Sequence, residues 1–592
     1  MAYGKLHVLP LSLFILIPVT FVTTYTISVQ WDHVVPGFPY ISETGTLLPE
    51  SCIFAQCLNI VALLLGCCVY IRHRQVLQWQ KERGHDLVGR RLVVVTAYCG
   101  VLACFGLDIL ANFHASVVAA HMVGAMTCFS ASILYFCLQT YLSYKMVPAV
   151  NNMIVVYVRA FLSVLTLKLT IASIVFGHIS MFEFQGHDYK KWLPADGGWG
   201  WHISSTICEW ILAIVYCAFL LTFVPDFRLI HFEDPVVTLI YLDKTESTVL
   251  ARTFCKGKSC ALQSEDSEDT PSNLTKERLA QRHHRPPEVE ILRVAARCIV
   301  KRHCHSLYRR QRAHIAIMEK QEFLVNLHYL PIAVFVSLPT IFILTYVIAV
   351  LLGHVEASFP YISQAAATAP ESCIFSQVVN IITLLMGFIV YIRYAQVREC
   401  TSVFHSSASL PKWNHWALIF GILSTAGLSI VANFQETSML VVHLIGAFLC
   451  FGSGTAYFWT QAVCSFYLHP SGCSLRLAHL RTALSTFSTV CFFIIVITGV
   501  LARLAYKGTN PRKWCKEDGG WELHITSTIT EWFCAMTFCV YILTFTEDFR
   551  DIRISHPKVI CNIHGLRSSN EALNESQNSS VVHERTNPST NT

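Results

Sequence analysis

The sequence predicts an all-α, polytopic membrane protein built from two tandem six-helix transmembrane bundles, with twelve spans in total. Three observations predict this fold class. Hydrophobic residues make up 53% and charged residues only 14% of the 592-residue chain, whereas soluble proteins average about 25% charged residues. Apolar stretches of about 20 residues, long enough to cross a bilayer, recur along the chain. The chain also repeats its own sequence.

The internal repeat is read most easily in one long motif. The segment FPYISETGTLLPESCIFAQCLNI begins at Phe38, and FPYISQAAATAPESCIFSQVVNI begins at Phe359. A second motif, DGGW, begins at Asp196 and again at Asp518. Matching pairs so far apart, in the same order, indicate that one domain has been duplicated.

Each copy contains six apolar spans. The spans predicted for the first copy are 8–29, 52–72, 92–111, 117–140, 154–177 and 203–225, and those for the second copy are 329–352, 373–393, 414–434, 438–461, 482–504 and 525–546. The first span exceeds a usual signal-peptide core, and its equivalent in the second copy lies inside the chain. We therefore expect a retained helix at the N-terminus.

Loop charges predict the orientation of the spans. Residues 30–51 contain no Lys or Arg, whereas the loop after the second span is basic, with Arg72, Arg74, Lys81, Arg83, Arg90 and Arg91. Because positive charge gathers on the cytosolic side, both termini and the segment between the copies are expected in the cytosol. Six spans per copy give both copies one orientation, so they are parallel repeats.

The predicted domains are 1–230 and 326–552, joined by a cytosolic linker over 231–325 and followed by a disordered cytosolic tail over 553–592. The linker combines an acidic, Ser-rich stretch from Ser264 with a basic amphipathic helix from Glu288. Such a helix can lie on anionic lipid or simply extend into solvent, and both interpretations stay open. Unknown cytosolic or membrane proteins are the other expected partners. A net charge of +6 is too small to indicate nucleic-acid binding.

Ionisable residues inside the spans are candidates for function, because charge is costly in a bilayer. Glu209 and Glu531 lie in the sixth spans, and His202 and His524 precede them by about two helical turns on the same face. The candidate intramembrane polar cluster is completed by His121, His443, Asn112 and Asn433. It could be a proton or ion relay, a lipid-headgroup site, or a hydrogen-bonded clasp between helices.

A second candidate is the loop motif on the non-cytosolic, lumenal side. It comprises Pro39, Tyr40, Glu50 and Ser51 in the first copy and Pro360, Tyr361, Glu371 and Ser372 in the second. Acidic and hydroxyl side chains suit helix N-termini, so capping of the second span and recognition of a lipid or partner are both possible. No catalytic, phosphate-binding or zinc motif was found, so no catalytic residue, cofactor or metal is expected.

Together, these motifs resemble the DRAM family of damage-regulated autophagy modulators. The resemblance rests on PYIS and PES before the second span, ANF in the third, a histidine in the fourth, and DGGW followed by His and EW at the sixth. The wider group includes transmembrane-protein-150 proteins, fungal Sfk-type proteins and the Cwh-type (CWH43-like) N-terminal domain. Its members have six spans, so a twelve-span chain departs from the pattern.

The resemblance implies a non-enzymatic membrane modulator of autophagy and lysosome function, in lysosomal or other endomembranes. Plasma-membrane relatives imply an alternative: a scaffold for phosphoinositide kinase or a modulator of mechanically gated currents. A transporter or channel component, or a factor in lipid (GPI-anchor) remodelling, is a further alternative. A water-filled cavity reaching Glu209 or Glu531 would favour transport, and a lumen-facing pocket with convergent acids and histidines would favour remodelling.

Overall fold

The computed structural model describes residues 2–3, 5–83, 88–113, 117–188, 191–239, 323–404, 407–470 and 472–561. Within these ranges, twelve helices are long and apolar enough to cross a membrane. The predicted fold class, two tandem helical membrane domains, is confirmed. The acidic stretch and the basic helix expected in the linker lie outside the described residues.

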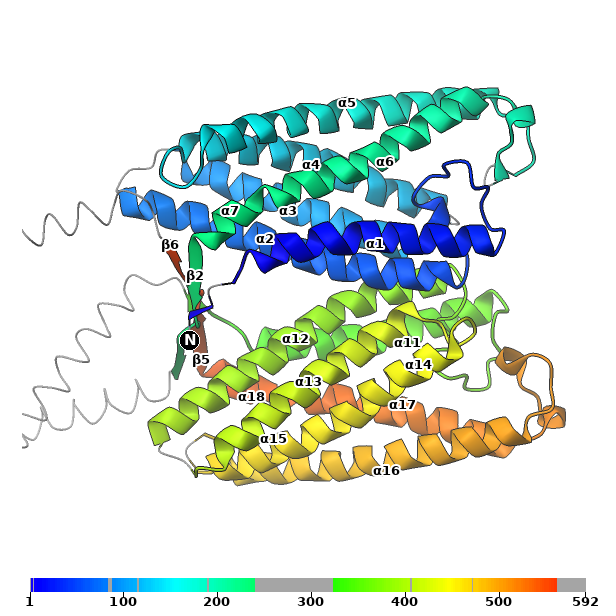
Figure 1. The fold of residues 1–592 in the computed structure, drawn as a ribbon. Coiled ribbons are helices and arrows are strands. Elements are labelled where there is room, and N and C mark those ends of the chain that lie inside the picture. The colour runs from blue at the N-terminus through cyan, green and yellow to red at the C-terminus, as the bar shows by residue number, and fades with distance from the viewer. Residues whose placement is uncertain are drawn as a thin grey trace, which may run out of the picture. The chain divides into compact units, whose positions relative to one another are not determined.

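The helices of the first copy pack side by side along their length (Figure 1). They are α1 (Val8–Gln30), α2 (Glu50–Arg83), α3 (Arg90–Asn112), α4 (Val118–Lys145), α5 (Met153–Glu183), α6 (Trp199–Leu221) and α7 (Phe223–Arg228). Helices α2 and α5 run beyond the predicted spans, because their polar ends continue the helix outside the apolar core. Arg72 therefore lies inside α2 and not in a loop.

The second copy repeats this order with one change. Its helices are α11 (Tyr329–Leu351), α12 (Glu371–Phe404), α13 (Leu410–Asn433), α14 (Leu440–Ala447), α15 (Gly454–Leu468), α16 (Leu475–Ala505), α17 (Trp521–Leu543) and α18 (Phe545–Arg550). A π-helical segment, η4 (Phe448–Ser453), joins α14 to α15, whereas the corresponding α4 is continuous. A π turn widens the helix locally, so the fourth spans of the copies differ in shape.

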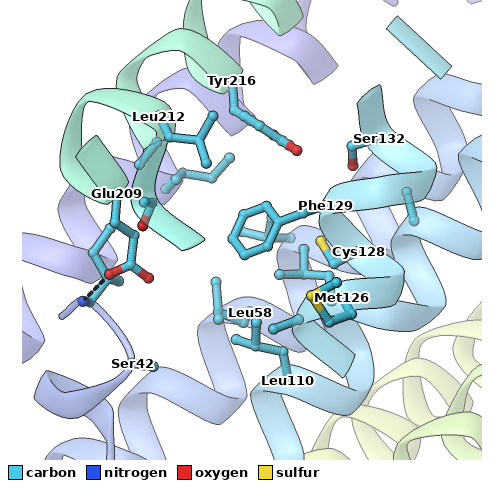
Figure 2. Close-up of a pocket in the computed structure, with 18 of the residues that line it drawn as sticks. Ser42, Leu58, Leu110, Met126, Cys128, Phe129, Ser132, Glu209, Leu212 and Tyr216 are labelled. Atoms are coloured by element: carbon cyan, nitrogen blue, oxygen red, sulfur yellow. Dashed lines mark hydrogen bonds between the residues drawn. The ribbon is translucent and has the colours of Figure 1, made fainter. Parts of the chain in front are cut away.

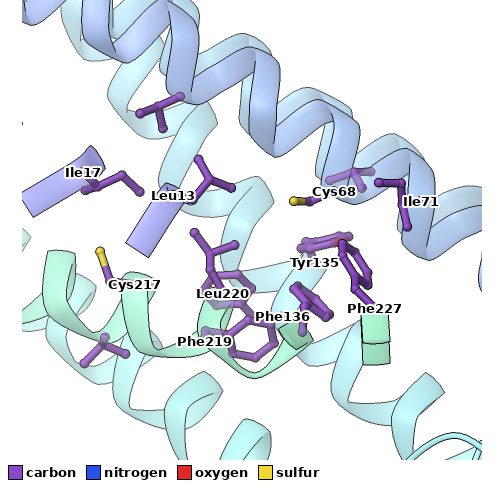
Figure 3. Packing of buried hydrophobic residues seen from close by; sticks show 14 of the residues in the cluster. Leu13, Ile17, Cys68, Ile71, Tyr135, Phe136, Cys217, Phe219, Leu220 and Phe227 are labelled. Atoms are coloured by element: carbon purple, nitrogen blue, oxygen red, sulfur yellow. The ribbon is translucent and has the colours of Figure 1, made fainter. Parts of the chain in front are cut away.

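The core of the first copy combines aliphatic and aromatic side chains, most of them from α1, α2, α4, α6 and α7 (Figure 3). Phe136 of α4 stacks on Phe219 of α6 with ring centroids 3.8 Å apart, and Phe458 stacks on Tyr541 at the same separation in the second copy. The other residues labelled in Figure 3 are Leu13, Ile17, Cys68, Ile71, Tyr135, Cys217, Leu220 and Phe227. Both copies thus join their fourth and sixth spans by stacked rings.

Glycines allow the third and fourth spans to approach closely. A Cβ on Gly106 of α3 would clash with the backbone nitrogen of Cys128 on α4, and one on Gly427 would clash in the same way with Cys450. Membrane helices associate through such small residues, because apolar burial from lipid gives little driving force. The α3–α4 contact therefore requires glycine at this position, because glycine has no Cβ.

The DGGW motif forms the turn that starts the sixth span. Gly197 and Gly198 have positive φ angles of 78° and 63°, a conformation that side-chain-bearing residues rarely adopt. A Cβ on Gly197 would also collide with the carbonyl oxygen of Glu183. Asp196 accepts the backbone N–H of Leu193 at 2.8 Å, so the turn explains the motif.

Short strands extend the helices at the ends of both copies. One sheet has the order β1 (Ala2–Tyr3), β2 (Ile230–Glu233), β6 (Lys558–Cys561), and the other has the order β3 (Val237–Leu239), β5 (Ile552–Ser555), β4 (Phe323–Leu324). The predicted linker therefore begins with strands, and the predicted tail contains most of β5 and all of β6. Hydropathy did not reveal these strands because they are short and partly polar.

The strands are exchanged between the copies. Strand β2, after the first copy, pairs with β6, after the second, and Ile230 lies opposite Cys561. Strand β3, also after the first copy, pairs with β5, and Leu239 lies opposite Ile552. Ile230 and Ile552 hold the same position in the repeat, and so do Leu239 and Cys561. The two pairs are therefore equivalent: in each, a residue of one copy lies opposite the repeat-equivalent of its partner from the other copy.

We expect Gly106→Ala to destabilise the protein, because the added methyl group must push α3 away from α4. Overpacking of this kind costs about 1–3 kcal/mol. The matched control is Gly66→Ala in α2, where a Cβ would meet nothing within 4 Å and alanine favours the helix by up to about 1 kcal/mol. Thermal unfolding of the detergent-solubilised full chain measures both. Equal melting temperatures for the two variants would contradict the close-contact role of Gly106.

Candidate functional site

In the first copy, the loop between α1 and α2 is bound to α6. The carboxylate of Glu209 accepts the backbone N–H of Ile41 at 3.1 Å, and the indole of Trp210 donates to the carbonyl of Pro39 at 2.9 Å. The Tyr40 hydroxyl donates to Ser205 Oγ at 2.7 Å. The loop motif and the intramembrane acid, which the sequence presented as separate candidates, therefore form one site.

His202 lies in the same site but does not hydrogen-bond to Glu209. Its ring stacks on Trp192 at 4.3 Å and meets the ring of Tyr40 edge-on at 5.3 Å. The side chain is buried, and its Nδ1 has no hydrogen-bond partner. His202 thus acts as an aromatic packing element beneath the loop.

The second copy repeats this site contact by contact. Glu531 accepts the N–H of Ile362 at 2.9 Å, and Trp532 donates to the carbonyl of Pro360 at 3.1 Å. His524 stacks on Trp514 at 4.2 Å and meets Tyr361 edge-on at 5.2 Å. The docked loop is therefore a property of the repeated domain.

The start of the second span contains a second buried acid. Glu50 is the first residue of α2, and one of its carboxylate oxygens lies 2.5 Å from Nδ1 of His33. Glu371 makes the same contact with His354, whereas the buried Ser51 hydroxyl has no partner. Ser372 is buried beside Glu371. Sequence reasoning missed His33, although its match with His354 in the repeat was the available signal.

Two titratable groups near the docked loop, Tyr40 and Asp32, have shifted pKa values. Burial raises the pKa of Tyr40 to about 12, so its hydroxyl stays protonated and can donate to Ser205. A hydrogen bond from Lys191, together with its charge, lowers the pKa of Asp32, and the two groups lie 2.8 Å apart. Both groups are exposed, and exposed pairs contribute little to stability. The buried contacts hold the loop.

The histidines of the fourth spans hydrogen-bond to backbone carbonyl oxygens at the ends of the third spans. Nδ1 of His121 lies 2.8 Å from the carbonyl oxygen of Phe113, and Nδ1 of His443 lies 2.7 Å from that of Phe434. These carbonyls follow the last residues of α3 and α13, where helices leave backbone groups unsatisfied. Neither histidine hydrogen-bonds to the span-six carboxylate of its copy.

Asn112 and Asn433 belong to a separate amide cluster between the copies. Asn112 exchanges hydrogen bonds with Asn59 of α2 and donates to Gln377 of α12 at 3.3 Å. The repeat-related contacts are those of Asn433 with Asn380 of α12 and Gln56 of α2, the latter at 3.0 Å. The predicted eight-residue polar cluster is thus divided into the docked-loop site, the helix-end histidines and this inter-copy cluster.

A cavity of about 720 Å³ lies beside Glu209 in the first copy. Figure 2 shows Leu58, Leu110, Met126, Phe129 and Leu212 around it, with Ser42, Cys128, Ser132, Glu209 and Tyr216 at its edges. The matching cavity beside Glu531 measures only about 60 Å³. The two copies share a polar frame but differ in the space beside it.

A buried ionic cluster at the opposite end of the first copy escaped the sequence analysis. Asp226 of α7 lies 3.0 Å from Arg72 and 2.6 Å from Arg159, and it accepts a hydrogen bond from Asn151 at 2.6 Å. Both arginines are fully buried. The recurrence of these residues at matching positions of the repeat is the sequence signal for this cluster. Loop-charge counting hides it, because it assigns Arg72 to a loop although the residue lies inside α2.

The described residues contain no group of three or more His, Cys, Asp and Glu side chains that could hold a metal ion. The site therefore consists of hydrogen-bonded polar side chains around a docked loop, with an apolar cavity in one copy. This arrangement holds the loop against the sixth span, and among the described residues no hydrogen bond joins His202 to Glu209.

Comparison with known proteins identifies the repeated unit. The Frag1/DRAM/Sfk1/Cwh43P N-terminal domain matches residues 5–230 and again 326–552. The chain is 33% identical to human DNA damage-regulated autophagy modulator protein 2 over 247 residues, which are 41% of this chain and 91% of that protein. It is 33% identical to human DNA damage-regulated autophagy modulator protein 1, covering 39% and 94% of the two chains. No solved structure matches.

We expect Asp226→Asn to destabilise the protein strongly, because it leaves two buried guanidinium groups without their counter-charge. Breaking a buried ion pair from one side costs about 3–5 kcal/mol. The matched control is Asp234→Asn, which removes a partly exposed partner of Arg398 at 3.0 Å and should cost less than about 1 kcal/mol. Thermal unfolding of the full chain in detergent measures both. A small and equal effect of the two changes would show that the buried cluster contributes no special stability.

Proposed function

The chain belongs to the Frag1/DRAM/Sfk1/Cwh43P family and carries the family's domain twice, and we propose that it is a non-enzymatic multi-pass membrane protein that modulates autophagy. The observation that carries this proposal is the 33% identity to two human proteins named autophagy modulators, over nine-tenths or more of their lengths. A zebrafish relative, 31% identical over 232 residues, is named a modulator of macroautophagy.

The geometry of the docked-loop site supports a regulatory role. Glu209 is engaged by the backbone of Ile41, and His202 is packed between aromatic rings. In the second copy the same contacts engage Glu531 and His524. These contacts use both residues to hold the loop, which supports a positioning role for them.

The cavity beside Glu209 also bears on the transporter alternative. Its walls are mostly apolar side chains, including Leu58, Leu110 and Leu212. A path for ions or protons requires polar groups or water along its length. The site therefore favours a regulator over an ion pathway.

We place this regulator in lysosomal or other endomembranes, with both termini in the cytosol. The basic segment between the copies is the proposed contact for anionic lipid or cytosolic partners, because positive charge next to a membrane attracts such surfaces. Residence in the plasma membrane, with a role in phosphoinositide-kinase placement or mechanically gated currents, is the second proposal.

Loss of the protein should reduce autophagic flux. We expect cells lacking it to show at least a halving of the lysosomal turnover of a lipidated autophagosome marker, measured as the difference with and without blocked lysosomal acidification. Re-expression of the full chain should restore turnover. As a matched control, a chain carrying Asp234→Asn, outside the docked-loop site, should restore it equally.

Organelle fractionation of the tagged full chain decides between the two locations. A signal in lysosomal fractions together with reduced flux supports the proposal. Normal flux together with a signal confined to the plasma membrane contradicts it and favours the phosphoinositide-kinase or current-modulating alternative.

A further inference from the structure

The cavity of the first copy has the size and lining of a binding site for an apolar small molecule. Its volume of about 720 Å³ lies within the range of roughly 300–1,000 Å³ that is typical of ligand pockets. It extends between α2, α3, α4, α5 and α6, and no Lys or Arg is among its described lining residues. A space of this size and character suits the apolar body of a lipid.

Polar side chains also line this space, among them Glu43, Glu209, His121 and His178. Glu209 uses one carboxylate oxygen, Oε2, to accept the N–H of Ile41, and its other oxygen points into the cavity (Figure 2). The hydroxyl-bearing Ser42 lies at the same side of the cavity (Figure 2). A ligand group that donates a hydrogen bond would therefore find an acceptor here.

The mouth of the cavity lies between α4 and α5. Val118, Met122 and Met126 of α4 and Ile174 and Met181 of α5 line the cavity and are themselves between 38% and 59% exposed. Exposed apolar faces of membrane-spanning helices meet lipid. A ligand thus enters sideways from the bilayer, which indicates a membrane component and not a water-soluble metabolite.

The second copy provides an internal contrast. It keeps the acid, Glu531, and the docked loop, but its cavity has a volume of only about 60 Å³. Cys450 and Phe451 of the π-helical segment line the remaining space, whereas Cys128 and Phe129, at the matching positions of the continuous α4, line the larger cavity. The space beside the acid is thus not needed to hold the loop.

We propose that the first copy binds one neutral, hydroxyl-bearing membrane lipid, with its hydroxyl donating to the free oxygen of Glu209 and its apolar body in the cavity between α4 and α5. A phosphate headgroup fits poorly, because it would face a carboxylate with no Lys or Arg among the described lining residues. Sterols and monoacylglycerols share the required chemistry. The proposal does not rest on a role in autophagy.

Photocrosslinking of the purified full chain in lipid nanodiscs tests this proposal. The probes are a photoreactive, alkyne-tagged cholesterol and a photoreactive, alkyne-tagged monoacylglycerol, with a photoreactive phosphatidylcholine for comparison, and crosslinked peptides are located by mass spectrometry. We expect one neutral probe to label peptides of α4 and α5 around Met122, Met126 and Met181. An excess of the same unlabelled lipid should abolish this labelling, and the competing lipid identifies the class.

The decisive variant enlarges two residues that line the cavity, Met126→Phe with Ser173→Ile. We expect labelling of α4 and α5 to fall at least fivefold. The matched control is Leu134→Phe, an exposed position of α4 outside the cavity lining, which should label like the unchanged chain. A second control, Glu531→Gln, alters the equivalent acid where there is no room for a ligand and should leave labelling unchanged.

Three results would overturn the proposal. Labelling that survives the paired substitution shows that the probe sits on the outer surface. Equal or stronger labelling of the same peptides by phosphatidylcholine shows that the site does not select a neutral head. Crosslinks confined to other helices of the unchanged chain exclude the cavity without any variant, so the test stands even if the paired substitution impairs folding.

Discussion

The hydrogen bond from the backbone of Ile41 to Glu209, and its equivalent from Ile362 to Glu531, is the contact on which the docked loop of each copy depends. A carboxylate in an apolar helix is costly unless it is partnered, and so is an unpaired N–H beside a membrane. One bond pairs the N–H with one oxygen of the carboxylate. Trp210 adds the carbonyl of Pro39, so the loop after the first span is fixed to the last span. The loop near the start of each copy is thereby held against the last long helix of the same copy.

The parts of this structure that could be predicted from sequence are those encoded locally. Hydropathy predicted twelve spans because the length and polarity of each apolar run are properties of that segment alone. The repeated motifs indicated the duplication. Arg72 was misassigned to a loop because its helix continues to Arg83. The partner of Glu209 could not be predicted, since every residue has a backbone N–H and no periodicity marks the N–H of Ile41. Asn112 was grouped with the wrong residues because its neighbours depend on how the copies pack.

The two copies show which features belong to the fold and which are free to vary. The docked loop, the stacked histidine and the capped ends of the third spans occur in both. The space beside the acid measures about 720 Å³ in the first copy and about 60 Å³ in the second, whose fourth span contains a π turn. The copies are therefore equivalent in architecture and different in what they can hold.

The exchanged strands determine what a single copy could do alone. Strand β2 has β1 on one edge and β6 on the other, and β6 belongs to the end of the second copy. A chain that ended after the first copy would keep the two-residue β1 but expose the other edge of β2, and open edges pair with other molecules. Two such half-length chains would have to associate in the membrane, at a rate set by their concentration there. Joining the copies makes this encounter intramolecular, so pairing depends on the effective concentration within one chain and becomes independent of expression level.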